Sequence, residues 1–381
     1  MGPRWTRHDG QIQDTRGDVL SVSRSALFVG SGATLSVDTS EARFAPLAAR
    51  QVVAARQAGS RATTNSTLLE VSNGYWDLLR SFSNEAIVRE AVENTQALER
   101  LAESYLRNEK LKQADAERIR AELRTRLGDL DLAGQEKRIV SARLGRLLRL
   151  DPFVTLLPAE DRPVPVEVVD SGQPRRELAA TALRNRPELA ESRSLAGAAA
   201  ARLLQAQYGP WLPSLLLDYD AGGFGGGPND FFGDFDGRSD VEAAAIWTVR
   251  NLGHGEWAAQ RERDSEVRQA RLRVIDQMDR VVSEVAEALA RVEARRAQLE
   301  TARTAVDAAQ QSYELNLRLF REGGIELILP IEVVQSVNAL TRARQDYLSA
   351  VVEYNRAQFQ LLWALGFPLH CVGEAVGKQA G

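Results

Sequence analysis

Cysteine and histidine are nearly absent from this 381-residue chain, which has one cysteine, Cys371, and three scattered histidines, His8, His254 and His370. A disulfide framework or a Cys/His zinc site needs several such residues at fixed spacings, and none can be assembled within one chain. Aromatic residues make up only 6%, and 48 basic residues against 52 acidic ones give a net charge of -4. The charge therefore provides no cationic excess for binding nucleic acid.

Long apolar runs are also missing. No stretch approaches the roughly 20 consecutive apolar residues that a membrane-spanning α-helix requires, which argues against a helical membrane protein. The N-terminus, residues 1–9, carries charge but no apolar segment, so the chain as written shows no secretory signal. No Ser/His/Asp or Cys/His set is legible from spacing, and we expect no catalytic group, no cofactor and no metal.

Two long segments dominate what is present. Both are rich in Ala, Leu, Arg and Glu, a composition typical of long helices. Turn residues and prolines divide the rest of the chain around them. We expect a strand-bearing start over 1–42, a helical hairpin over 43–150, a linker over 151–176, a helix with two strands over 177–256, a second hairpin over 257–366, and a tail over 367–381.

Apolar residues recur at every seventh position in the second hairpin, which predicts a coiled-coil seam. The other seam positions are mostly Ala or Arg, so the apolar stripe is thin. This favours a wall of helices with one water-exposed face over a closed two-stranded coiled coil. The recurring residues are Val285, Val292, Leu299, Val306, Tyr313 and Phe320, followed by Val333, Leu340, Tyr347, Tyr354 and Leu361.

The chain also repeats itself. A shift of 215 positions places Val52 on Val267, Tyr105 on Phe320 and Leu150 on Leu365, without a gap over about 109 residues. Each half is therefore expected to be one unit, in which strands are followed by a long helical hairpin. The second half has a helix before its strands, and the counterpart in the first half would lie upstream of Met1. We therefore expect an N-terminal helix, and a signal peptide before it, to be missing.

Helices of about 65 residues would extend about 100 Å and need other helices along their whole length. The strand pieces, including 215–219 and 242–249, occur in two Gly-flanked places, each able to supply two antiparallel strands. Because an isolated hairpin is marginal in water, we expect these strands to complete a sheet with other subunits. Asp218 and Glu242 alternate with Tyr219 and Val241, a pattern typical of strands with one polar and one apolar face.

Several short motifs resemble the TolC-like outer membrane efflux protein family, and their order extends over about residues 19 to 366. They are FAPLAAR (44–50), NGYWDL (73–78), LRNRPEL (183–189), GPWLPSL (209–215), WTVRNLG (247–253), LPIEVVQS (329–336) and NRAQF (355–359).

The resemblance implies a mainly helical fold with a small β part. Its helical hairpins would form an α-barrel wall, and each protomer of a homotrimer would give four strands to one β-barrel in the outer-membrane lipid. It implies a periplasmic tunnel that exports small molecules or other cargo together with a periplasmic adaptor protein and an inner-membrane pump. The long connection over 323–330 departs from the family pattern.

The expected pore constriction lies where the two helices of each hairpin meet. The candidates are Asp115 and Glu117 in the first half and Glu332 and Gln335 in the second. The resemblance places the constriction carboxylates near Asp115 and near Glu332 with Gln335. In a trimer each carboxylate would occur three times around the axis, and such a ring attracts cations. The alternative is an ordinary solvated helix face.

Two further sets of residues are candidates. Gly323 and Gly324 are interpreted either as a hinge or adaptor contact, or simply as a helix C-cap. Trp211, Tyr219 and Trp247 flank the strand region of the second half. The resemblance implies that they form an aromatic girdle at a membrane interface, and the alternative is packing in a soluble sheet. The glycine run 222–227 lacks the Lys-Ser/Thr of a phosphate-binding loop, and we expect it to be an extracellular loop.

Two other functions remain open at this point. A soluble, elongated coiled-coil scaffold or periplasmic adaptor would share the helical composition, although adaptors usually carry a β-sandwich between their helices. An enzyme with a helical domain has only the glycine run in its favour.

Overall fold

The computed structural model describes residues 2–227, 235–323 and 328–368. It contains long helices and a four-stranded antiparallel sheet, which confirms the predicted fold class. The chain divides into two compact units, the first made of residues 1–56 and 191–274 and the second of residues 57–190 and 275–381. Helices α1 (Thr39–Arg107), α4 (Pro187–Tyr208) and α5 (His254–Gly323) contribute residues to both units.

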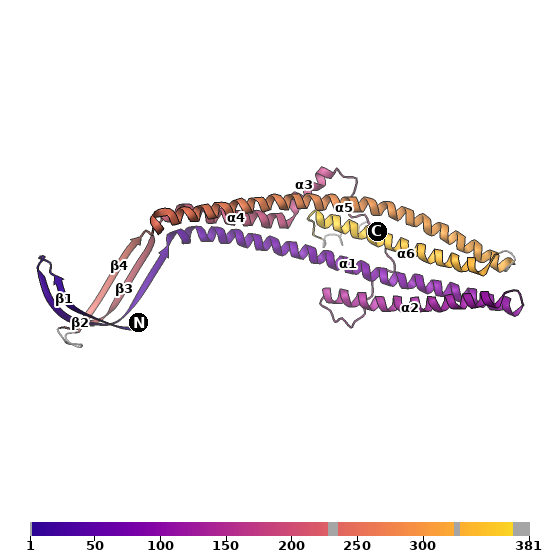
Figure 1. The fold of residues 1–381 in the computed structure, drawn as a ribbon, viewed down its shortest axis with the longest axis horizontal. Coiled ribbons are helices and arrows are strands. Elements are labelled where there is room, and N and C mark those ends of the chain that lie inside the picture. The colour runs from indigo at the N-terminus through magenta and orange to yellow at the C-terminus, as the bar shows by residue number, and fades with distance from the viewer. Residues whose placement is uncertain (1, 228–234, 324–327, 369–381) are drawn as a thin grey trace. The chain divides into compact units, whose positions relative to one another are not determined.

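The first unit contains the sheet, whose strand order is β1 (Gly2–Gln13), β2 (Val19–Asp38), β3 (Ser214–Gly225) and β4 (Asp236–Ile246). Strand β2 is long enough to pair with β1 over 19–30 and with β3 over 27–38. The four strands come from the two places that the sequence predicts (Figure 1). The sequence placed the last strand over 242–249, but β4 begins and ends earlier because its pairing with β3 sets both limits.

The glycine run is not the loop that the sequence predicted, because 222–225 form the end of β3. A Cβ atom on Gly222 would lie 2.4 Å from the carbonyl oxygen of Val29 and 2.5 Å from the Cα atom of Gly30. The two strands approach so closely here that only glycine fits.

The sheet has one apolar face and one polar face, as the alternation predicts. Leu215, Leu217 and Tyr219 of β3 share a face with Leu35 of β2 and Val241 of β4. These five side chains are all exposed in the single chain. The opposite face carries the cross-strand pairs Asp218 with Glu242 and Asp220 with Asp240, and Thr34, which donates a hydrogen bond to Asp218 (3.0 Å). Among the described residues, the outer edges of β1 and β4 pair with no strand.

Alanines allow the helices α1 and α4 of the first unit to pack closely against each other, where Gly197 of α4 faces Gln51 of α1. The start of α1 buries Ala48 and Ala55, and α4 buries Ala198 and Ala199. The hydroxyl of Thr39, where α1 begins, donates to the carbonyl oxygen of Pro213 (2.6 Å), just before β3. This contact connects the first helix to the sheet.

The second unit contains two helical hairpins. One pairs α1 with α2 (Gln113–Leu147), and the other pairs α5 with α6 (Pro330–Ala364) (Figure 1). Helices α2 and α6 have 35 residues each, while α1 has 69 and α5 has 70. The heptad seam is confirmed over most of its length, since Val285, Val292, Leu299, Tyr354 and Leu361 are buried in one cluster. The seam positions Val306, Tyr313 and Tyr347 are only half-buried.

The proline-rich linker is bound to α6 by two fully buried amide side chains. Asn355 accepts a hydrogen bond from the N–H of Val166 (2.8 Å) and donates one to the carbonyl oxygen of Val164 (2.8 Å). Gln358 accepts from the N–H groups of Val168 (3.2 Å) and Val169 (2.9 Å). The linker therefore satisfies part of its backbone through side chains of α6.

A buried arginine holds the end of α3 (Arg175–Asn185) against α5 and α6. The Arg186 guanidinium contacts the carboxylates of Glu284 (2.6 Å) and Glu188 (3.1 Å) and lies 4.1 Å from the ring centre of Trp363. Gly366 has a φ of +80°, and a Cβ atom there would lie 2.8 Å from the nitrogen of Arg186. Ion pairing, cation–π contact and close backbone approach together account for Arg186 and Glu188 of the LRNRPEL motif.

The amide contacts of Gln358 are expected to contribute measurably to the free energy of unfolding. Gln358→Ala leaves the N–H groups of Val168 and Val169 buried without an acceptor, so the free energy of unfolding falls by about 1–3 kcal/mol. Denaturant unfolding measures this loss. The matched control is Gln311→Ala on the exposed face of α5, which is expected to change little; an equal effect of both variants would contradict this account.

Glu85 of α1 predicts a pH dependence. Burial opposes its ionisation, but the hydrogen bond and charge of Lys137, together with Arg89 at 2.8 Å, lower the pKa of the Glu85 carboxyl below its ordinary value. This stabilisation is complete above the ordinary glutamate pKa and is lost as the pH falls through the lowered value. Thermal unfolding of Glu85→Gln is therefore expected to depend less on pH in the acid range than that of the parent. Glu136→Gln, at an exposed position on α2, is the matched control, and an equal change of pH dependence in both variants would contradict this account.

Candidate functional site

The predicted constriction residues lie in the second unit, near the end of each helical hairpin. Here α1 ends at Arg107, α2 begins at Gln113, α5 ends at Gly323 and α6 begins at Pro330. One buried cluster joins all four helix ends, and it contains Leu98, Ala102, Leu111, Ala116, Ile119, Phe320, Ile328, Val333 and Val334.

Two residues related by the sequence repeat touch each other in this cluster. The Tyr105 hydroxyl donates to the carbonyl oxygens of Phe320 (3.0 Å) and Arg321 (3.2 Å), and the rings of Tyr105 and Phe320 meet edge to face at 5.3 Å. The last turn of α5 thereby gains a donor for carbonyls that have no partner within the helix. The two hairpins are thus joined at equivalent positions.

A few residues determine the backbone conformation at these helix ends. After α1, Glu109 has a φ of 57° and the N–H of Lys110 donates to the carbonyl oxygen of Tyr105 (2.9 Å), which closes the helix. Pro330 starts α6, where no N–H partner is needed. Gly323 is the last residue of α5, and Gly324 lies outside the described residues.

The two acidic candidates of α2 are both paired with arginines one turn away. Asp115 is half-buried and contacts Arg118 (3.3 Å). Glu117 is exposed and contacts Arg120 (2.7 Å), which also reaches Glu103 (3.2 Å). The hydrogen bond to Glu103 and the charge of Glu117 raise the pKa of the Arg120 guanidinium, so the charge of Glu117 is largely compensated.

The candidates of α6 have a different environment. Glu332 and Gln335 are exposed, on the face of α6 opposite to the buried Val333, Val334 and Val337. Within the described part of the chain, neither side chain makes an ion pair or a hydrogen bond. Their polar groups are therefore free to interact with ions or with another molecule.

A shallow groove brings the two sets of candidates close to each other. It has a volume of about 280 Å³ and is lined by Asp115 and Arg118 of α2 and by Pro330, Ile331 and Val334 of α6. Asp115 therefore lies beside the first turn of α6, which carries Glu332. The structure thus places Asp115 and Glu332 in the same region of the molecule.

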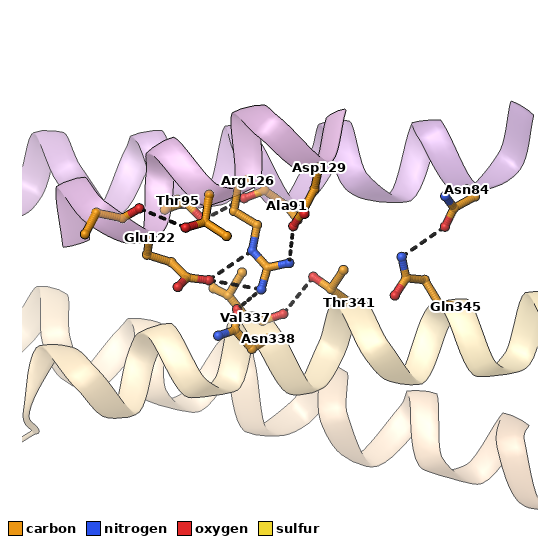
Figure 2. A network of polar contacts seen from close by, with 12 residues as sticks. Asn84, Ala91, Thr95, Glu122, Arg126, Asp129, Val337, Asn338, Thr341 and Gln345 are labelled. Atoms are coloured by element: carbon orange, nitrogen blue, oxygen red, sulfur yellow. Dashed lines mark hydrogen bonds and ion pairs between the residues drawn. The ribbon is translucent and has the colours of Figure 1, made fainter. Parts of the chain in front are cut away.

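A polar network between α2, α6 and α1 was missed by the sequence reasoning (Figure 2). The Arg126 guanidinium contacts Glu122 (3.0 Å) and Asp129 (3.4 Å) on its own helix and donates to the side-chain oxygen of Asn338 on α6. Further along α6, Gln345 donates to Asn84 of α1 (2.9 Å).

Helix α6 also contacts its neighbours through an arginine of its own. Arg344 of α6 pairs with Glu90 of α1 and donates to Gln310 of α5 (2.9 Å). The sequence did carry a signal for this contact face, because Asn338, Thr341 and Gln345 recur at intervals of three and four residues on α6. Polar residues at helical spacing can thus mark a contact face as well as a solvated one.

The three aromatic candidates lie in the first unit. Trp211 and Trp247 are brought together at the end of the sheet where β3 begins and β4 ends, and the indole N–H of Trp247 donates to the carbonyl oxygen of Trp211 (3.4 Å). Tyr219 lies further along β3 on the apolar face. All three side chains are exposed in the single chain.

The described residues include neither a membrane-spanning helix nor a cluster of metal ligands. None of their helices combines the length and the apolar character needed to cross a membrane. Their His, Cys, Asp and Glu side chains form no group of three or more that could hold a metal ion.

No family model matches the sequence, and no curated protein matches it either. Solved structures do match. The outer-membrane channel OprN is 18% identical with a TM-score of 0.76, and the match covers 96% of this chain and 80% of that one. The outer membrane protein VceC from Vibrio cholerae is 17% identical with a TM-score of 0.73, covering 96% and 85%.

The outer membrane channel MtrE of Neisseria gonorrhoeae, in its open state, is 17% identical with a TM-score of 0.69, and the match covers 97% of this chain and 81% of that one. The likeness extends over both helical hairpins and the sheet, because almost the whole chain is matched. The chain therefore has a TolC-like fold, the fold of these outer-membrane channels.

Proposed function

We propose that this chain is a subunit of an outer-membrane channel, through which small molecules or other cargo leave the periplasm. The observation that carries the proposal is the sheet of the first unit, which is apolar on one face, polar on the other and unpaired at both described edges. The fold likeness to outer-membrane channels supports the same function.

The sheet is suited to a wall between lipid and water. Its apolar face, with Leu215, Leu217 and Val241, would contact lipid, and its polar face, with Asp218 and Glu242, would line the lumen. Four strands are too few to close, since the smallest barrels need about eight. Several copies must therefore contribute strands, and the family that the motifs resemble uses three. We propose a homotrimer on this basis.

The helices would form the tunnel wall in the periplasm. Apolar side chains remain exposed on α2 and α5 of the second unit, and further copies of the chain would cover them. These residues are Leu127, Leu132 and Ile139 on α2, and Ile275, Val282 and Leu315 on α5. A periplasmic adaptor and an inner-membrane pump complete the proposed assembly, with the α5–α6 connection at Gly323 and Gly324 as the proposed adaptor contact.

Glu332 is the strongest candidate for the constriction. Its carboxylate is exposed and unpaired among the described residues, whereas Asp115 and Glu117 each contact an arginine. Three copies would place three Glu332 carboxylates around one axis, with Gln335 one turn further along. A soluble scaffold or adaptor is the weaker function, because it gives no role to the exposed apolar face of the sheet.

Conductance across a planar lipid bilayer tests the channel and its constriction together. The purified parent chain is expected to form cation-preferring pores. Glu332→Gln should lower the cation preference about two- to threefold, because a ring of charge partly screened by salt is removed. Gln335→Glu, which adds a charge one turn away, should raise it.

Glu136→Gln is the matched control and should leave selectivity unchanged. Unchanged selectivity in the Glu332 and Gln335 variants would remove them from the constriction. Absence of any conductance from membrane-inserted parent protein would contradict the channel itself.

A further inference from the structure

The connection from β4 to α5 and the first turn of α5, together residues 247–257, expose large apolar side chains in a row. Leu252 is 95% exposed, Val249 is 64% exposed, and Trp247 and Trp257 are each more than half exposed. Trp211, 80% exposed, lies beside Trp247. A surface loop in water gains nothing from such a composition, since an exposed apolar cluster normally marks a contact with another molecule.

This row continues the apolar face of the sheet beyond the last strand. Side chains of β4 alternate, so Val241 and Ala245 point to the apolar face, and the same alternation leads to Trp247 and Val249. Thr248 and Arg250 have the opposite parity, and they line a cavity of about 780 Å³ with Asp38 and Ser214 from the polar side of the sheet. The division into an apolar and a polar side therefore extends past Ile246 into the loop.

The backbone of the loop holds Leu252 in an unfavourable conformation. Asn251 and Leu252 have φ values of 50° and 56°, and Gly253 follows at 90°. The left-handed region is sterically unfavourable for leucine, because its Cβ atom crowds the following carbonyl oxygen. A strained leucine that is almost fully exposed contributes nothing to packing within the chain, so the strain points to a role outside it.

A buried carboxylate fixes the loop to the start of α5. Glu256 is 8% exposed, and its Oε1 atom accepts hydrogen bonds from the backbone N–H of Arg250 (2.9 Å) and from the Arg250 Nε atom (3.2 Å). The ends of the turn are thereby held together while Leu252 projects between them. The conformation of the loop is therefore fixed by contacts within the chain.

We propose that residues 247–257, together with Trp211, form a lipid-contacting loop in which Leu252 enters the bilayer interface next to the apolar face of the sheet. The proposal rests on the proposed function, since it needs that face to contact lipid. The partner is a phospholipid at the level of its glycerol and upper acyl chain, where tryptophan with its apolar ring and polar N–H is preferred. The Arg261 guanidinium, 4.6 Å from the ring centre of Trp257, is placed to meet the phosphate.

Spin labels at single cysteines test this directly in the full chain. Cys371→Ser removes the one native cysteine, and Leu252→Cys then carries the label. The protein is reconstituted into vesicles of phosphatidylethanolamine and phosphatidylglycerol, and collision rates with oxygen and with a polar nickel chelate are measured. Leu217→Cys, on the apolar face, reports whether the sheet itself contacts lipid. Asp307→Cys, at an exposed position on α5, is the aqueous control.

The label at position 252 is expected to collide with the nickel chelate about tenfold less often than the label at 307, because the bilayer excludes the polar chelate. Its collisions with oxygen should rise. Chelate access equal to that at 307 would place the loop in water, and low access to both reagents would place it against another copy of the chain. Either result overturns the proposal. A label at 217 that behaves as if in water would instead contradict the proposed channel.

Discussion

In the proposed channel the open four-stranded sheet has to be completed by other copies of the chain, and the proposed assembly depends on this constraint. Strand edges with unpaired N–H and C=O groups cost several kcal/mol per group when water is removed, so in lipid they must be paired. Leu215, Leu217 and Val241 form an exposed apolar face, and Asp218 and Glu242 lie on the opposite, polar face. In the proposed channel the first face would meet lipid and the second would meet water. In the proposed channel, closure with other copies would satisfy both requirements, and the same assembly would cover the exposed apolar residues of α2 and α5.

The helices of the second unit depend on polar contacts in addition to their apolar seam. Their apolar seam is thin, so charged and amide side chains supply contacts that the seam cannot. Arg344 connects α6 to α1 and α5, Asn355 and Gln358 hold the linker, and Arg186 holds the end of α3. Such contacts require one arrangement of the helices, because a shift of register leaves a buried polar group without a partner. These polar contacts therefore define how the helices are arranged, although the apolar core between them is small.

Patterns with a period were predictable from the sequence. The heptad positions Val285, Val292 and Leu299 are buried together, and the alternation of Asp218 with Leu217 and Tyr219 describes the two faces of the sheet. Contacts that follow no periodic residue pattern were not predicted from the sequence. The amide of Gln358 reaches a backbone 189 residues away, and the glycine run at 222 reflects a close approach to Val29, which lies on another strand. The sequence also named both Glu117 and Glu332 as candidates, and the contact of Glu117 with Arg120 distinguishes the two carboxylates.

Cross-linking of the sheet edges tests most directly whether copies of the chain close into one barrel. Pairs of cysteines, one on β1 and one on β4, are introduced at successive positions in the Cys371→Ser background and oxidised in the membrane. Closure by three copies predicts that at least one pair gives covalent species that end at three times the chain mass of 42.0 kDa. Monomers at every position, or a ladder that continues beyond three chains, would contradict the account.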